Sequence, residues 1–149
     1  MTDRIVFVDE QDNVIGAGTR QEAVEKGIIH RIVRVFLFNS KGELLLQKRS
    51  MNISLPGLWD HSAAGHVDEG DDYLSAALKE LEQEVGVQGV ELQEVHKFFS
   101  SHTEAGYAPR KNFNMIYKTV YDGPITLSPD EVAETKWVTL EELKRWLTE

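Results

Sequence analysis

The segment GHVDEGDDYLSAALKELEQEVGV, residues 65–87, joins a glycine-bounded loop to a predicted helix. Asp71 or Asp72 can cap this helix at its start, and Gly86, directly after Val85, is a natural left-handed stop. The apolar residues fall on one side of the helix when about 100° is allowed per residue. The helix is therefore expected to bury a stripe formed by Leu74, Ala77, Leu78, Leu81 and Val85.

Acidic residues gather on another side of the same helix. Glu80 and Glu84 are one turn apart, so their carboxylates are neighbours, and Gln83 lies on the same side. The preceding loop has Gly65 and Gly70 at its ends, where the backbone can approach a ligand closely. Because Mg²⁺ prefers hard oxygen ligands, few from protein and the rest from water and phosphate, the pattern indicates a Mg²⁺ site. An ordinary solvated acidic helix face has the same spacing.

The full spacing resembles the Nudix box, G-x5-E-x7-R-E-U-x-E-E-x-G-U, in which U is aliphatic. The positions that match outright are Gly65, Glu80, Leu81, Glu84, Gly86 and Val87. Asp71 and Lys79 preserve the charge of the motif, whereas Gln83 replaces a usual glutamate. The resemblance extends to the strand–turn–strand at 33–49 and to the C-terminal segment 131–143. Residues 1–149 are therefore interpreted as a single Nudix domain.

The resemblance implies a fold, a reaction and a partner. The expected fold is an α/β/α sandwich with a mixed β-sheet and an N-terminal β-hairpin. The expected reaction is hydrolysis of a diphosphate linkage in a nucleoside diphosphate-linked or related small molecule, with Mg²⁺ as cofactor and Mn²⁺ as an alternative. A homodimer is expected from the family resemblance alone.

The resemblance also assigns roles to residues of the box. Glu80 and Glu84 would bind the metal, together with the backbone near Gly65 and, as a weaker amide ligand, Gln83. One of these glutamates, or a carboxylate on a nearby loop, would take the proton from the attacking water. Lys79 stands for the family's arginine, which usually pairs with the catalytic glutamates and orients them.

Four further residues are candidates for contacts with substrate. His66 follows the first glycine of the box, and Arg49 ends a predicted strand, where it could bind phosphate oxygens. In the polar loop 101–111, Glu104 could supply a further carboxylate and Tyr107 could stack on a base. Each has an ordinary alternative, such as a histidine that satisfies a backbone carbonyl or a solvated loop residue.

The segment LPGLWDHSAAGH, residues 55–66, is similar to the isopentenyl-diphosphate isomerase branch of the family, in which a short strand ends in Cys-Gly-His. His30 and His66 match members of that branch's metal-ligand set. Ala64 occupies the cysteine position, and Asn112 and Asn114 stand where the isomerase carries acidic residues. None of these three can act as an acid or base. Hydrolysis is therefore favoured, with an isomerase-like enzyme and a catalytically weak ligand-binding module as alternatives.

The rest of the chain is predicted to consist mostly of strands. Their expected ranges are 5–8, 14–15, 30–38, 43–49, 59–64, 90–99, 113–121 and 135–138. Thr19 and Thr139, each followed by a glutamate three residues later, predict two shorter helices, the first ended by Gly27. Trp59 and Phe99 are expected in the core. This order predicts a mixed sheet covered by helices on both faces.

Composition excludes several functions. Hydrophobic residues make up 41% of the 149 residues, and no apolar stretch is long enough to predict a membrane span. The chain has no cysteine, which excludes disulfides, thiolate metal sites and cysteine nucleophiles. A formal net charge of -9 disfavours nucleic acid polymers and anionic membranes as partners. With no visible signal peptide, a cytoplasmic location is expected.

Overall fold

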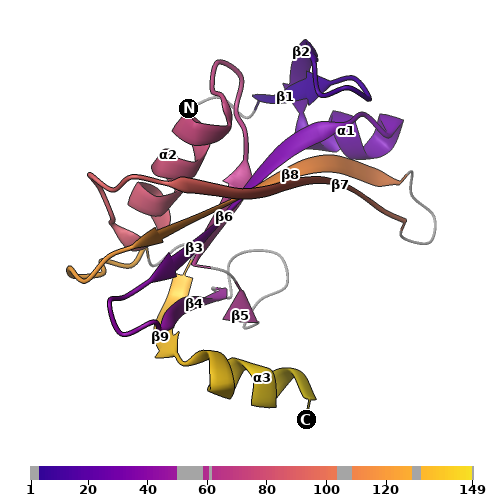
Figure 1. Cartoon of the computed structure of the whole chain (residues 1–149). Helices are drawn as coiled ribbons and strands as arrows, with labels where there is room; N and C mark the ends of the chain where they lie inside the picture. Colours follow the sequence, from indigo (N-terminus) through magenta and orange to yellow (C-terminus); the bar gives the residue numbers. More distant parts are fainter. Residues whose placement is uncertain (1–3, 50–58, 61, 104–108, 129–131, 149) are drawn as a thin grey trace.

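The computed structural model describes residues 4–49, 59–60, 62–103, 109–128 and 132–148. These residues form a nine-stranded mixed sheet with three helices, which confirms the predicted fold class (Figure 1). The strands are β1 Arg4–Val8, β2 Val14–Thr19, β3 His30–Phe38, β4 Leu44–Arg49, β5 Trp59–Asp60, β6 Ala63–His66, β7 Gln93–His102, β8 Arg110–Val120 and β9 Val132–Val138. The helices are α1 Arg20–Lys26, α2 Tyr73–Val85 and α3 Leu140–Thr148. None of the described helices is long and apolar enough to cross a membrane.

The central strand of the sheet is β3. It pairs with β6 in antiparallel orientation and with β8 in parallel orientation, and β8 pairs with β7 on its other side. The predicted N-terminal hairpin, β1 and β2, joins β3 where Phe7 lies opposite His30. In the described sheet β6 pairs with β3 alone, so its outer edge faces α2.

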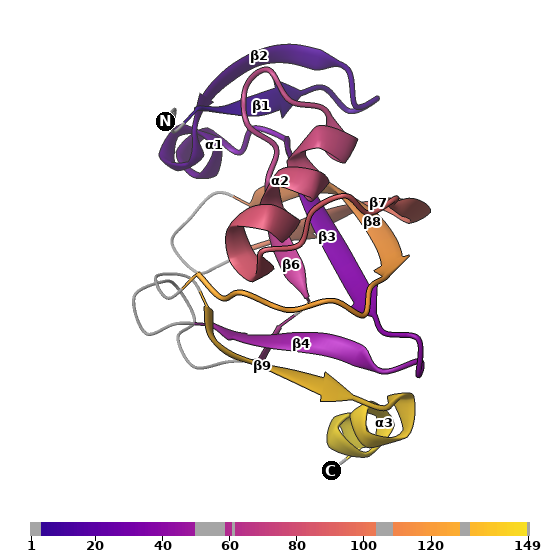
Figure 2. The same ribbon diagram turned by 90° about the vertical axis from the view of Figure 1, so that its left-hand side faces the viewer.

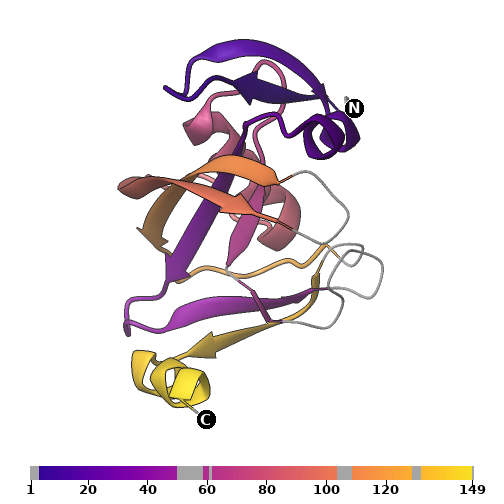
Figure 3. The ribbon, with the colours of Figure 1, turned by 90° about the vertical axis from the view of Figure 1, so that its right-hand side faces the viewer.

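Helices lie against both faces of this sheet, because successive side chains of β3 point to opposite sides. Val33 and Val35 are fully buried and pack in one cluster with Leu81 of α2, which covers the face toward the viewer in Figure 2. Phe36 lies on the other face, in a cluster with Leu143 of α3. Figure 3 shows that second face, with α2 behind the sheet.

The ends of α2 are as predicted, but its orientation differs from the prediction. Asp72 caps the first turn, and Gly86 ends the helix with a left-handed φ of 70°. Leu74 and Leu78, expected in the core, are 45% and 36% exposed, whereas Glu84 is only 8% exposed. The other members of the predicted stripe are buried, namely Ala77, Leu81 and Val85. The helix is rotated so that part of its acidic side faces β6, where hydrogen-bond donors compensate the burial of Glu84.

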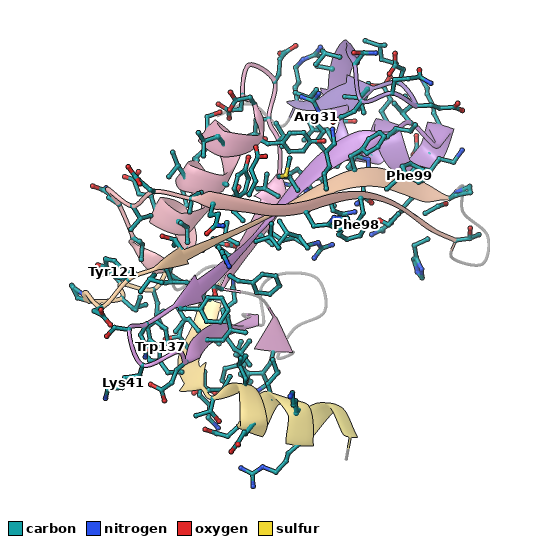
Figure 4. The ribbon with its side chains drawn as sticks, in the orientation of Figure 1. Arg31, Lys41, Phe98, Phe99, Tyr121 and Trp137 are labelled. Atoms are coloured by element: carbon teal, nitrogen blue, oxygen red, sulfur yellow. The ribbon has the colours of Figure 1, made fainter. Side chains whose placement is uncertain are left out.

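The expectation that Trp59 and Phe99 lie in the core is wrong, since their exposed fractions are 39% and 47%. Both are on peripheral strands: β5 is two residues long, and β7 pairs only with β8 in the described sheet. Figure 4 labels Phe99 on this outer strand. An aromatic residue on a sheet edge has fewer neighbours that could bury it.

Several of the remaining boundaries agree with the predictions, but β2 extends to Thr19 instead of ending at residue 15, and β9 begins at Val132 instead of residue 135. Thr19 and Thr139 each accept a hydrogen bond from the backbone N–H three residues later, as their capping patterns predicted. The strand predicted at 59–64 consists of two strands, β5 and β6, and the strand predicted at 90–99 begins at Gln93. These differences do not change the position of the loop and helix at 65–87.

Candidate active site

The carboxylate of Glu80 lies directly against Gly65. A methyl group added at Gly65 would come within 2.5 Å of Glu80 Oε1 and 2.8 Å of Oε2. A side chain at position 65 would displace the Glu80 carboxylate, so glycine is what allows this α2 carboxylate to lie against the backbone of β6. The first glycine of the motif and this glutamate, far apart in the sequence, therefore form one structural unit.

Glu84, one turn further along α2, reaches the neighbouring residue of β6. Its Oε2 accepts the backbone N–H of Ala64 at 3.0 Å and the side-chain amide of Gln47 at 3.3 Å. The Gln47 amide also donates to the Ser62 carbonyl at 3.2 Å, which fixes its position. The carboxylates of Glu80 and Glu84 thus meet two consecutive residues of β6.

Lys79 ties the start of α2 to the loop that precedes it. Its Nζ forms a short ion pair with Asp71 Oδ2 and a second pair with Asp68 Oδ2 at 3.6 Å. The hydrogen bond with Asp71 is the main cause that raises the pKa of Lys79 above its usual value. Lys79 would therefore position the glutamates through the helix rather than by the direct pairing that the resemblance implies. Gln83, between them in sequence, is exposed.

The residues present fit a hard divalent cation that arrives with a phosphate ligand. Among the described residues, no group of three or more histidine, aspartate and glutamate side chains could hold an ion. Mg²⁺ does not need such a group, because it is usually bound through one or two carboxylates plus water and substrate phosphate. Glu80 and Glu84 supply that number of carboxylates on one side of α2.

Two histidines stack on the face of the sheet that is turned away from α2. The rings of His30 and His66 have centroids 5.2 Å apart and planes 27° apart. Burial is the main cause that lowers the pKa of both imidazoles, that of His66 to about 3, and the nearby charges of Arg20 and Arg110 lower both further. Both rings are therefore neutral near pH 7.

Arginines surround this histidine pair. Strand alternation places Arg34 on the same side of β3 as His30, and Arg34 is a third positive charge that lowers the pKa of His66. We call the surface formed by these five residues the arginine–histidine face: Arg20, His30, Arg34, His66 and Arg110. It belongs to the side of the sheet shown in Figure 3.

The structure brings some of the predicted site residues together and leaves others undescribed. Gly65, Glu80 and Glu84 meet at β6, and His66 follows directly on the same strand but points to the opposite face. Arg49 ends β4, and its side chain lies outside the described residues. The candidates Glu104 and Tyr107 also lie outside them.

Sequence reasoning did not find Gln47, Arg20, Arg34 or Arg110 as site residues. A regular polar pattern was lacking at Arg34, because Ile32 stands between His30 and Arg34 on that face of β3 and Arg31 is polar on the other face. Gln47 had no such pattern either. Its contact with Glu84 depends on how β4 and α2 pack in three dimensions.

A separate groove of about 930 Å³ lies at the other end of β3 from His30. It is formed by the β3–β4 turn, the segment that leads into β7, and the end of β8, and its lining includes Ser40, Leu92 and Lys118. None of the predicted site residues lines it, so it is distinct from the carboxylate pair.

The chain is similar to known proteins over most of its length. A model described as NUDIX domain matches residues 28–149. A Pseudomonas aeruginosa protein named as an uncharacterized Nudix hydrolase is 36% identical over 138 residues, which cover 92% of this chain and 79% of that protein. An isopentenyl-diphosphate Delta-isomerase of Serratia proteamaculans is 33% identical over 144 residues, covering 96% and 80%. The crystal structure of DR0079 from Deinococcus radiodurans has a TM-score of 0.77 and 27% identity, covering 97% of this chain and 88% of that one.

Proposed function

We propose, from the premise that this chain belongs to the Nudix family of hydrolases acting on phosphorus-containing acid anhydrides, that it uses Mg²⁺ to cleave a diphosphate linkage in a small molecule. Members of the family generally use divalent cations, and Mn²⁺ is the alternative ion. The substrate class we propose is a nucleoside diphosphate linked to a second moiety, or a closely related diphosphate.

The observation that carries this proposal is the convergence of two carboxylates on one short strand. Glu80 lies against Gly65, and Glu84 accepts the N–H of Ala64. A merely solvated acidic helix face would leave both side chains in water and would not expose Leu74 and Leu78 instead. Burial of Glu84 in place of a leucine supports a functional role for the acidic side of α2.

The chain's own residues would provide positioning and proton transfer. A cation held by Glu80 and Glu84 would supply charge neutralisation at the phosphates and a lowered pKa for bound water. The hydrogen bonds from Ala64 and Gln47 fix one oxygen of Glu84 before substrate binds, which avoids reorganisation during the reaction. One of the two glutamates would accept the proton of the attacking water.

Hydrolysis can be tested with a panel of nucleoside diphosphates, sugar nucleotides, dinucleotides and prenyl diphosphates, each with Mg²⁺, Mn²⁺ or EDTA. We expect cleavage of at least one polar diphosphate with Mg²⁺ and none with EDTA, measured as release of phosphate or nucleoside monophosphate. Absence of turnover throughout would contradict the proposal. If ligands still bound, that result would identify a catalytically weak binding module, the alternative that Gln83 favours.

An isomerase of isoprenoid diphosphates is the second candidate, favoured by the similarity to the Serratia proteamaculans protein. Against it, Ala64 occupies the position of that branch's cysteine and offers only its backbone N–H, which is bonded to Glu84. Incubation with isopentenyl diphosphate separates the two functions. Migration of the double bond without release of phosphate would support the isomerase. We expect no migration of the double bond.

A further inference from the structure

The arginine–histidine face has a floor of buried polar side chains. The exposed fractions of His30, Asn112 and Asn114 are 5%, 7% and 0%. Burying such groups is costly unless they are hydrogen-bonded, and both asparagine amides donate to Ser100 Oγ, at 3.2 Å and 2.9 Å. The floor is therefore a fixed polar surface in the middle of a sheet, where apolar side chains would be the ordinary choice.

The charge of this face is positive, on a chain whose formal net charge is -9. Arg34 Nε donates to Asn114 Oδ1 at 3.1 Å, which is a neutral partner. Among the described residues, none of the ion pairs joins Arg20, Arg34 or Arg110 to a carboxylate. The charges of three guanidinium groups thus act on His66, and none of these groups forms an ion pair with a carboxylate in the described part of the chain.

Two stacked histidines close to a site for diphosphates could suggest a second metal ion. The charges of the face oppose that reading, because three arginines repel a divalent cation and positions 112 and 114 carry neutral amides. The same charges attract an oxyanion, and a guanidinium matches phosphate geometry with two parallel hydrogen bonds. The electrostatic field of this face therefore selects an anion.

We propose that the arginine–histidine face is a second ligand site, which binds a phosphoryl group directly and without a bridging metal ion. Arg34 and Arg110, which strand alternation places on the same face as His30, provide the charge, and Asn114 holds Arg34 in place. His66 follows Gly65 on β6, so this site lies across the strand from the carboxylate pair. Binding at the face does not require hydrolysis to occur.

Calorimetric titration with inorganic pyrophosphate in the presence of EDTA tests this site alone, because EDTA removes any metal-dependent binding at Glu80 and Glu84. We expect the wild-type chain to bind, and Arg34→Gln and Arg110→Ala each to weaken binding by roughly tenfold, the scale of a lost charge-assisted hydrogen bond. Arg34→Gln keeps a donor for Asn114, and Arg110 is exposed, so neither change should disturb folding.

Lys41→Ala is the matched control for these variants. It removes one positive charge from an exposed turn at the opposite end of β3 from α1, as Figure 4 shows. We expect its affinity for pyrophosphate to stay within about twofold of wild type, since an exposed charge so far away is screened by salt. Equal weakening by Lys41→Ala would show that net charge alone determines binding, and would overturn the proposal.

Two other results would also overturn it. One is absence of pyrophosphate binding without metal. The other is tight Mn²⁺ binding by the Glu80→Gln/Glu84→Gln double variant, which would place a cation at the histidines. The same double variant separates the two proposals, because it should lose hydrolysis and keep metal-free pyrophosphate binding. In hydrolysis assays, competitive inhibition by pyrophosphate that Arg34→Gln weakens would assign the site to a phosphate of the substrate, and non-competitive inhibition to free phosphate; we expect competition.

Discussion

Two charged clusters lie on opposite faces of β3, and they differ in how their charges are balanced. On the α2 side, Asp12 receives hydrogen bonds from Arg31 Nε at 2.8 Å, Tyr73 Oη at 2.8 Å and Lys97 Nζ at 2.9 Å. We call these four residues the Asp12 cluster; Figure 4 labels Arg31 beneath the N-terminal hairpin. On the other side, the arginine–histidine face has three arginines and no carboxylate partner within the described residues.

The difference indicates what each cluster is for. The Asp12 cluster joins the turn of the N-terminal hairpin to β3, α2 and β7, and the single carboxylate of Asp12 pairs with both cations. Such a cluster stabilises the fold, because each of its charges has a partner within the chain. The arginine–histidine face buries polar groups at a cost in stability, and its positive charge is not neutralised by an ion pair within the described residues, as expected of a binding surface. Neighbouring residues of one strand, His30 and Arg31, therefore serve different purposes.

The Glu80–Glu84 pair is next to the arginine–histidine face, because both include residues of β6. A substitution in this pair should have the largest effect on activity. Glu84→Gln should lower the rate of hydrolysis by about 10²-fold or more, because it removes one of the two carboxylates that we propose hold the metal. The melting temperature should change little, since a glutamine oxygen can still accept the Ala64 N–H. Glu82→Gln, on the exposed side of α2, is the matched control and should leave the rate unchanged. A loss below about threefold for Glu84→Gln would make it a structural residue.

The Asp12 cluster should show the reverse pattern. Asp12→Asn keeps a residue that tolerates the φ of 65° at this position but leaves two cations without their anion. We expect a loss of about 2 kcal/mol in the free energy of unfolding, which is below the roughly 3–5 kcal/mol typical of broken buried pairs, because Lys97 is partly exposed. Urea denaturation measures this loss, and hydrolysis per folded molecule should stay within about twofold.

Glu22→Gln provides the control for Asp12→Asn, since it breaks an exposed ion pair with Lys26. The side chain of Lys26 is 64% exposed and that of Glu22 is 39% exposed. That change should cost no more than about 0.5 kcal/mol. If Asp12→Asn instead reduced hydrolysis and left stability intact, the division between a structural and a binding cluster would be wrong.

Local sequence patterns predicted the secondary structure well, because caps, turns and strand alternation depend on residues close in sequence. The cap at Thr19, the stop at Gly86 and the central strand at 30–38 all agree with the structure. The Asp12 cluster was not predicted, since Asp12 and Lys97 are 85 positions apart and meet only through the sheet. Long-range contacts of this kind leave no periodic trace in one sequence.

The orientation of α2 shows a second limit of sequence reasoning. Hydrophobicity alone would bury Leu74 and Leu78, yet both are exposed and Glu84 is buried. Local periodicity gives no information about the backbone N–H of Ala64 or the amide of Gln47. The hydrogen bonds that these groups donate compensate the burial of the Glu84 carboxylate. The spacing of the box did predict which glutamates lie together, but not that the helix turns them toward β6.

Acid titration should separate the two clusters by the pH at which each loses stability. Burial lowers the pKa of folded His66 to about 3, whereas the ordinary value of 6.5 applies to the unfolded chain. Below pH 6.5 only the unfolded chain takes up this proton, so the unfolding free energy falls by up to about 1.4 kcal/mol per pH unit. Burial raises the pKa of the Asp12 carboxyl, but hydrogen bonds from Arg31, Lys97 and Tyr73 outweigh this effect and keep the pKa below its ordinary value of 3.8. The contribution of Asp12 to stability is therefore lost only below pH 3.8.

Urea denaturation between pH 7.5 and 4.5 measures the contribution of the histidine. His66→Gln cannot titrate and should flatten the decline in this window, whereas Asp12→Asn should lower the whole curve without changing its slope there. His30, whose pKa burial also lowers, leaves a residual slope in the His66 variant. A wild-type curve that is flat from pH 6.5 to 4.5 would mean that the imidazoles are protonated in the folded chain, and a phosphoryl group would then meet two additional charges.

The smallest expected effect comes from adding a charge beside the carboxylate pair. Gln83→Glu places a third carboxylate on the acidic side of α2 and should tighten Mg²⁺ binding by about threefold to tenfold, since the added charge is exposed and partly screened. Gln93→Glu, exposed at the start of β7, adds the same charge elsewhere and should have no effect. Metal-free pyrophosphate binding should be unchanged in both variants, because the arginine–histidine face lies on the other side of β6. If Gln83→Glu weakened pyrophosphate binding while its Mg²⁺ titration stayed unchanged, the charge at this position would act on the anion site and the cation would have to bind elsewhere.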